Sequence, residues 1–166
     1  MRRSLFVVFA LSITVPVIAD APSKAPVEES INQLVAQFGD GIAVSYDKYR
    51  RIEFGKIFGS DRDDAIALFS IEGFGGGNGH AEYLAFFESV EKNEMAKAKS
   101  RPFRLVGVTQ TGGRGWRSFD GKKVAIGRGF VTLTGKKYGP NDAACCPSVP
   151  ITVTFRIKNG MISEEK

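Results

Sequence analysis

Cysteine and histidine are scarce in this sequence. Its 166 residues include two cysteines, which are adjacent at Cys145 and Cys146, and one histidine, His80. A structural zinc site needs several cysteine or histidine ligands, and a Cys-x-x-Cys redox motif needs two residues between its cysteines. The sequence contains neither pattern, so we expect no bound metal and no cofactor.

Long apolar runs are equally scarce, and the clearest one spans residues 5–18. Arg2 and Arg3 precede this run and Ala19 follows it, which is the order of a secretory signal peptide. The run is too short for a typical transmembrane helix. We therefore predict export to the periplasm or out of the cell, with a mature chain that begins at Asp20. No cysteine directly follows the run, so we expect no lipid-attached membrane anchor after cleavage.

Cleavage after Ala21 is the alternative, but it would place Pro22 directly after the cut, where the peptidase accepts proline poorly. The sequence then divides into a signal peptide at residues 1–19, a flexible lead-in at residues 20–26 and one domain at residues 27–166. The remaining chain is long enough for a domain with its own hydrophobic core.

A strong excess of charge of either sign is missing as well. The chain has 23 basic and 18 acidic residues; the predicted signal peptide contains two of the basic ones and none of the acidic ones, which leaves a mature net charge of +3. A concentrated basic stripe is typical of nucleic-acid-binding proteins, so we expect no nucleic-acid partner. The mild positive charge permits attraction to an anionic envelope polymer, and another envelope protein is the alternative partner.

Hydrophobic periodicity predicts the fold class. Residues 27–38 repeat apolar side chains at helical spacing, with Ile31, Leu34, Val35 and Phe38 on one face. After Gly41 the period changes to two, which is typical of strands. We predict an α+β, mainly β, single domain in which the N-terminal amphipathic helix packs on an antiparallel sheet. The expected strands are residues 52–58, 65–74, 82–90, 103–110, 123–134 and 151–158.

Two of these strands also indicate their position in the sheet. Residues 65–69 are apolar on both faces and are expected to be central. Residues 151–158 alternate without a break, which predicts one buried and one exposed face. The face expected to be buried consists of Ile151, Val153, Phe155 and Ile157. Residues 88–100 are the one other segment that could form a helix.

The adjacent cysteines have three possible states in an oxidising compartment. They can bond to each other, bond to another molecule or stay reduced. We predict a bond between Cys145 and Cys146, because the two sulfur atoms are at high effective concentration and the chain has no other cysteine. Such a pair could serve as a rigid apolar surface for a ligand, as a redox-active group or as a structural turn.

A resemblance to known proteins starts from this cysteine pair. Residues 142–148 read Asp-Ala-Ala-Cys-Cys-Pro-Ser, and an alternating strand and an Asn159-Gly160 turn follow. Together with the segments 61–68 and 75–80, this pattern resembles exported bacterial proteins that include the mycobacterial LppP/LprE-type lipoproteins. The lipid-attachment cysteine of those lipoproteins is missing here. The resemblance implies export and a similar fold, and it implies no activity.

Two other motifs suggest ligand sites but favour structural roles. The glycine-rich residues 74–80 lack the Gly-x-x-x-x-Gly-Lys-Ser/Thr spacing of a phosphate loop and join two strands, so we expect a wide hairpin. Asp61, Asp63 and Asp64 lack the glycine and the distant glutamate of a calcium loop. We therefore interpret this acidic cluster as a solvated turn.

The candidate binding residues are Trp116, Arg114, Arg117 and His80. Tryptophan and arginine dominate many interfaces, so Trp116 between two arginines suggests a docking surface. The alternative is that Trp116 covers the core, with residues 119–122 forming a hairpin turn. His80 would have to serve in any Ser-His-Asp or Cys-His catalytic set, but a single histidine among glycines is more often a loop residue.

These observations favour an exported, non-catalytic binding domain of the bacterial envelope. The first alternative is a thiol-disulfide protein that uses Cys145 and Cys146. The second is an envelope hydrolase that recruits His80 or a pair of carboxylates, such as Glu82 and Glu88. The chain presents no complete catalytic motif, which is why the binding domain comes first.

Overall fold

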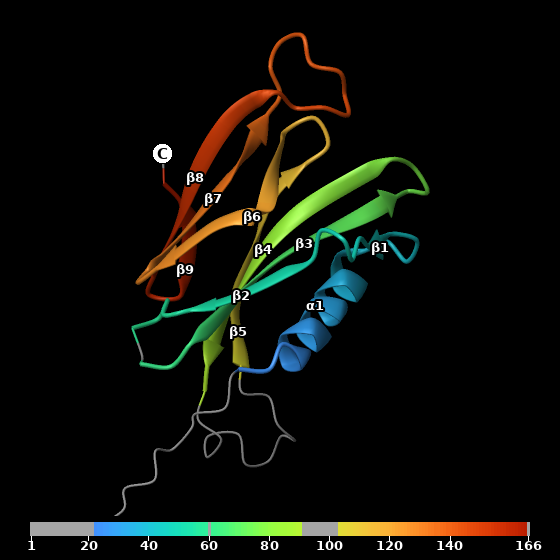
Figure 1. The fold of residues 1–166 in the computed structure, drawn as a ribbon. Coiled ribbons are helices and arrows are strands. Elements are labelled where there is room, and N and C mark those ends of the chain that lie inside the picture. The colour runs from blue at the N-terminus through green and yellow to red at the C-terminus, as the bar shows by residue number, and fades with distance from the viewer. Residues whose placement is uncertain (1–21, 60, 91–102, 166) are drawn as a thin grey trace, which may run out of the picture.

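The computed structural model describes residues 22–59, 61–90 and 103–165, and over these residues the chain forms one helix and one antiparallel sheet of nine strands (Figure 1). The mainly β, single-domain prediction is confirmed. The predicted signal peptide and most of the possible helix at residues 88–100 lie outside the described residues. The elements are α1 (Ala25–Phe38), β1 (Val44–Ser45), β2 (Arg51–Gly55), β3 (Asp64–Phe74), β4 (Gly79–Ser89), β5 (Phe103–Gly113), β6 (Arg117–Gly127), β7 (Phe130–Lys137), β8 (Val149–Lys158) and β9 (Met161–Glu164).

The sheet is a meander in which strands β3 to β9 pair in chain order, while β1 and β2 both pair with β3. Pairing is nearly interrupted between β5 and β6, which share only the pair Gly113 and Arg117. Beyond this pair the two strands separate. The sheet folds over at this point, so that β9 approaches β5 and β2 approaches β6.

Helix α1 covers one face of the sheet. Its buried residues Val27, Ile31 and Leu34 pack against β3, β4 and β5, and Val35 and Phe38 complete the contact. Pro26 lies in the first turn, where its missing N–H has no helical partner to lose. The helix and the apolar face predicted from periodicity are confirmed.

The opposite face of β3 and β4 packs against the folded-over strands. Leu68 and Phe86 belong to a second core cluster with Leu133 of β7 and Phe155 of β8. Strand β3 is therefore buried on both faces, as its sequence predicts. The alternating strand β8 buries Val153 and Phe155 and half-buries Ile151 and Ile157, so its predicted register is also confirmed.

Two local predictions around β6 are wrong. Residues 123–134 form the end of β6, a turn at residues 128–129 and the start of β7, because Gly129 adopts a φ of 74° that reverses the chain. Residues 119–122 do not form a hairpin turn but an irregularity within β6, where the register with β7 shifts. The Asp120 carboxylate accepts a hydrogen bond from the Lys122 N–H there, a local bond that is common to turns and bulges.

Loops gather at two opposite ends of the molecule (Figure 1). The first, here named the loop end, consists of residues 39–43, 75–78, 114–116 and 138–148. The second, the turn end, consists of residues 56–59, 61–63, 128–129 and 159–160. Among the described residues, no helix has the length and apolar character needed to cross a membrane.

Candidate functional site

The loop end brings together the residues that the sequence singled out. The His80 carbonyl accepts a hydrogen bond from the Arg114 N–H at 3.2 Å, which joins the β3–β4 hairpin to the β5–β6 turn. The Trp116 carbonyl accepts one from the Tyr138 N–H at 3.3 Å. The Tyr138 hydroxyl in turn donates to the Ala144 carbonyl at 2.6 Å, next to Cys145. Hydrogen bonds therefore connect the turn at residues 114–116 to His80 on one side and to the cysteine loop on the other.

Trp116 is the main exposed aromatic side chain of this end. It is 46% exposed, whereas the next residue, Arg117, is only 4% exposed. The Arg117 guanidinium carbon lies 4.1 Å from the centre of the Trp116 ring and 5.2 Å from that of Phe119. The arginine thus supports one face of the indole from inside the protein and leaves part of the ring open to solvent.

Arg117 is itself fixed by several partners. Its two terminal nitrogens donate to the two carboxylate oxygens of Glu164 at 2.8 and 2.6 Å, and its Nε donates to the Thr111 carbonyl. The hydrogen bonds from Arg117 lower the pKa of Glu164 below its ordinary value. The sequence placed Arg117 among the surface-binding residues, but its guanidinium is engaged inside the chain and positions Trp116 instead. Arg114 is exposed.

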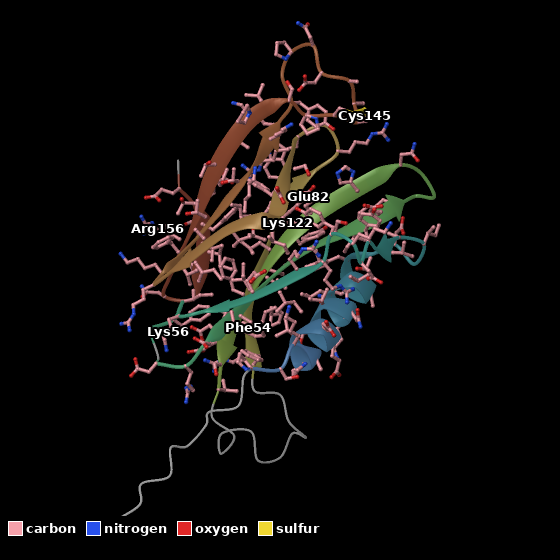
Figure 2. The ribbon with its side chains drawn as sticks, viewed as in Figure 1. Phe54, Lys56, Glu82, Lys122, Cys145 and Arg156 are labelled. Carbon is pink, nitrogen blue, oxygen red and sulfur yellow. A yellow bond between two sulfur atoms is a disulfide. The ribbon has the colours of Figure 1, made fainter. Side chains whose placement is uncertain are left out.

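The cysteine pair lies on the loop between β7 and β8. Cys145 and Cys146 are both exposed and form a close pair with Cα atoms 3.8 Å apart, on a loop that projects beyond the sheet (Figure 2). The Asp142 carboxylate accepts N–H hydrogen bonds from Gly139 at 2.8 Å and Ser148 at 2.7 Å, which close the loop at its base. These bonds lower the pKa of Asp142. The pair is therefore accessible on a loop of defined shape.

A second carboxylate closes the neighbouring loops. Asp40 accepts N–H hydrogen bonds from Ile42 and Ala43 and, at 2.6 Å, from Gly75 in the β3–β4 hairpin. The bond from Gly75 is the main cause of the lowered pKa of Asp40. Ile42 and Val44 beside this contact are 62% and 63% exposed. The loop end therefore has an apolar rim in addition to Trp116.

His80 lines a shallow pocket of about 360 Å³ near this rim, together with Val44 and Glu72. In the part of the chain that the structure describes, its imidazole makes no hydrogen bond to a serine, a cysteine or a carboxylate. The predicted wide hairpin is confirmed, since Gly75 and Gly76 adopt φ values of 63° and 73° between β3 and β4.

Glu82 of β4 is a buried carboxylate near the loop end, and the sequence did not predict its hydrogen bonds. It is 2% exposed and fills the space where β5 and β6 separate. Its oxygens accept hydrogen bonds from the Tyr49 hydroxyl at 2.8 Å, the Ser118 hydroxyl at 2.6 Å and the Phe119 N–H at 3.0 Å. A Cβ at Gly112 would lie 2.7 Å from Glu82 Oε2, so only glycine leaves room for this side chain. Burial, followed by the charge of Glu82, raises the pKa of Tyr49.

Asp64 corrects a prediction for the acidic cluster. Its side chain is not solvated but fully buried, and it accepts backbone hydrogen bonds from Ile57, Phe58 and Ser89 at 2.8 to 3.0 Å. A buried carboxylate is stable where N–H donors surround it, and here the donors come from the turn before β3 and the end of β4. Within the described residues, no group of three or more His, Cys, Asp or Glu side chains is placed to hold a metal ion.

A pocket of about 250 Å³ lies beside the loop end, between β6, β7 and the cysteine loop. Its charged residues are Lys123, Lys136 and Asp120. Ser118 and Thr134 contribute hydroxyl groups, and Pro147 of the cysteine loop closes one side. Neither the pocket nor its position next to Trp116 could be anticipated from the sequence, because its wall combines three separate segments.

No protein-family model, curated protein or solved structure matches this chain. Chemically, the loop end and the pocket beside it offer an aromatic face, exposed cations, hydroxyl groups and a cysteine pair. Aromatic faces and fixed polar groups of this kind are suited to binding a ligand.

Proposed function

We propose that this protein is an exported, non-catalytic binding domain of the bacterial envelope that contacts its ligand through the loop end. The observation that carries this proposal is the half-exposed Trp116 ring, supported from beneath by the buried Arg117. Export is part of the proposal and is supported by the signal-peptide order of residues 1–19 and by the resemblance to exported bacterial proteins.

Preorganisation is the physical argument for binding. An exposed tryptophan that is free to rotate loses side-chain entropy when it binds a ligand, which reduces affinity. At this site Arg117 is already locked by Glu164 and Thr111, and the Trp116 carbonyl is bonded to Tyr138. The ring therefore has its orientation before the ligand arrives, and most of the ordering cost is met during folding.

Charge determines the class of partner. Arg114, Lys136 and Lys137 are exposed around Trp116, and Lys137 lies opposite Arg117 in the β6–β7 register. The nearest acidic group of the cysteine loop, Asp142, already accepts two backbone hydrogen bonds. An anionic partner, either an envelope polymer or an acidic face of another envelope protein, fits this surface.

Co-sedimentation with purified insoluble envelope fragments tests the proposal. We expect wild-type protein to pellet with the fragments and Trp116→Ala to stay in the supernatant. Leu105→Ala is the matched control, because Leu105 is another exposed large apolar residue, at 40% exposure, and lies on β5 outside the loop end. Equal loss of binding in both variants, or no binding by the wild type, would overturn the proposal.

A thiol-disulfide protein is the second candidate, because Cys145 and Cys146 are exposed and a soluble dithiol could reach them. In such a reaction the dithiol would be oxidised to its disulfide as the cysteine pair takes up two electrons and two protons. This function predicts that the reduced protein transfers these electrons to a peptide disulfide. Mass spectrometry of alkylated thiols before and after the peptide is added checks it, and unchanged thiols would exclude it.

A further inference from the structure

We propose that the ligand of the loop end is an acidic glycan, with one sugar ring on Trp116 and the carboxylate of a uronic acid in the pocket between β6 and β7. This inference rests on the proposed binding function and names its ligand class. The residues that carry it are Trp116, Ser118, Lys123 and Lys136.

Trp116 and the pocket are neighbours along β6 and across to β7. Trp116 lies two residues before Ser118, which lines the pocket. The Trp116 carbonyl also accepts a hydrogen bond from the Tyr138 N–H, and Tyr138 lies two residues after the pocket residue Lys136. Residues two apart in an extended chain are separated by about 6.5 Å, which is comparable to the length of one sugar unit. A ligand of two or three sugars therefore spans both features.

The pocket combines positive charge with hydrogen-bond acceptors. Lys123 and Lys136 line it and supply ammonium groups for a carboxylate. The Ser118 hydroxyl donates its proton to Glu82 Oε1 at 2.6 Å, so its oxygen faces a ligand as an acceptor. The Asp120 carboxylate is a second acceptor on the wall.

This combination selects among anionic ligands. A ligand that fits must carry a negative charge for the lysines and must also donate hydrogen bonds to Ser118 and Asp120. A sugar acid does both, because its ring bears hydroxyl groups beside the carboxylate. Polyphosphate carries the charge without such donors, polyglutamate has backbone N–H donors but no hydroxyl groups, and a neutral glycan has the hydroxyl donors without the charge.

The aromatic contact fits the same ligand. The faces of a sugar ring expose C–H groups with slight positive charge, and these match the negative face of an indole. One face of Trp116 is occupied by the Arg117 guanidinium, at 4.1 Å, so a sugar stacks on the solvent side of the ring. Arg117 thereby positions Trp116 and does not touch the ligand.

Titration calorimetry with polygalacturonate oligomers tests the inference. We expect saturable binding that falls at least about tenfold in the double variant Lys123→Ala/Lys136→Ala, because two charge-assisted contacts are lost. The control is Lys48→Ala/Lys158→Ala, which removes the same charge from exposed positions that do not line the pocket. A loss of the same size in the control would show that binding depends only on net charge and would overturn the inference.

The second part of the test compares the binding of different polymers. We expect polyglutamate, polyphosphate and neutral dextran of matched length to bind at least about tenfold more weakly than polygalacturonate. Equal binding of polyglutamate or polyphosphate would overturn the glycan class. If polygalacturonate does not bind but envelope fragments still retain the wild type and not Trp116→Ala, the ligand inference fails and the proposed binding function survives.

Discussion

At each end of this molecule an aspartate accepts backbone hydrogen bonds that hold a loop in place. The two aspartates, Asp64 and Asp142, differ in how deeply they are buried. At the turn end, Asp64 is fully buried and accepts three backbone N–H groups, from Ile57, Phe58 and Ser89. At the loop end, Asp142 is only partly buried and accepts two, from Gly139 and Ser148. The same chemistry therefore stabilises the fold at one end and only shapes a loop at the other.

The difference indicates that the turn end contributes to the stability of the fold, whereas the loop end is free to contact a ligand. Buried polar groups without partners are costly, so the contacts of Asp64 cannot be lost without unfolding the turn end. Loop contacts in solvent can exchange with water, so the loop end can change its sequence or its ligand at little cost to the fold. Glu82 and Arg117 lie next to the loop end and are both buried. Glu82 accepts a hydrogen bond from Ser118 of β6, and Arg117 supports the Trp116 ring.

Replacing the two aspartates gives the largest expected contrast. Asp64→Ala leaves three N–H groups without their acceptor and is expected to lower the free energy of unfolding by about 3 kcal/mol or more. Asp142→Ala is expected to lower it far less than Asp64→Ala, because water replaces the lost bonds. Urea unfolding curves measure both. Equal losses would show that the two ends do not differ in the way described.

Removing the support beneath Trp116 is expected to have the next largest effect. Arg117→Ala removes a buried guanidinium that pairs with Glu164, for a loss of about 2 to 3 kcal/mol in the free energy of unfolding. The emission of Trp116, the only tryptophan in the chain, is expected to shift to the red as the ring gains freedom. Arg114→Ala, at an exposed position in the same turn, is the control, with a change of about 0.5 kcal/mol or less. A red shift of the same size in Arg114→Ala would contradict the role of Arg117.

Acid is expected to weaken the hydrogen bonds that Asp40 and Asp142 accept at the loop end. Asp40 and Asp142 have pKa values lowered from 3.8 by the N–H groups of Gly75 and Gly139. Carboxylates with lowered pKa values stabilise the folded state above the ordinary pKa, and this contribution is lost as the pH falls through the lower folded values. Protection of the Gly75 and Ser148 amides against hydrogen exchange, relative to the intrinsic rate at each pH, should therefore fall below about pH 3.8. In Asp142→Asn, the change at Ser148 should disappear while that at Gly75 remains.

The cysteine pair is expected to contribute least to stability. Changing both Cys145 and Cys146 to serine should lower the free energy of unfolding by less than about 1 kcal/mol, because a bond between neighbours closes too small a ring to restrict the unfolded chain. Intact mass after alkylation under denaturing conditions shows whether the bond is present in the wild type. A loss as large as that of Asp64→Ala would mean that the cysteine loop is part of the core.

Local patterns predicted the fold well where one face of an element is buried. The helix face around Ile31 and Leu34 and the alternation through Phe155 follow from periods of 3.6 and two, and both patterns decide burial directly. The Asp120-Gly121 signal was misleading, because the same residues favour a hairpin turn and a bulge. Nothing in the local pattern distinguishes the two, and the pairing with β7 decides the outcome.

The candidate site was predictable in its residues but not in its arrangement. Trp116, His80 and the cysteine pair stand out by their rarity, yet their common position depends on a meander that returns three loops to one end. The buried roles of Asp64, Glu82 and Arg117 were not predictable, because charged residues are usually exposed and their donors lie far away in the sequence. Asp64 and Ser89, for example, are 25 positions apart.

The most direct test of the loop end as the binding surface uses its own tryptophan. Because Trp116 is the only tryptophan, its emission reports this end of the molecule alone. Titration of the protein with solubilised envelope glycans should shift the emission to the blue as the exposed ring becomes covered. The shift should saturate at the same ligand concentration as the heat of binding measured by calorimetry. Saturable heat without any change in Trp116 emission would place the binding surface elsewhere and contradict the account.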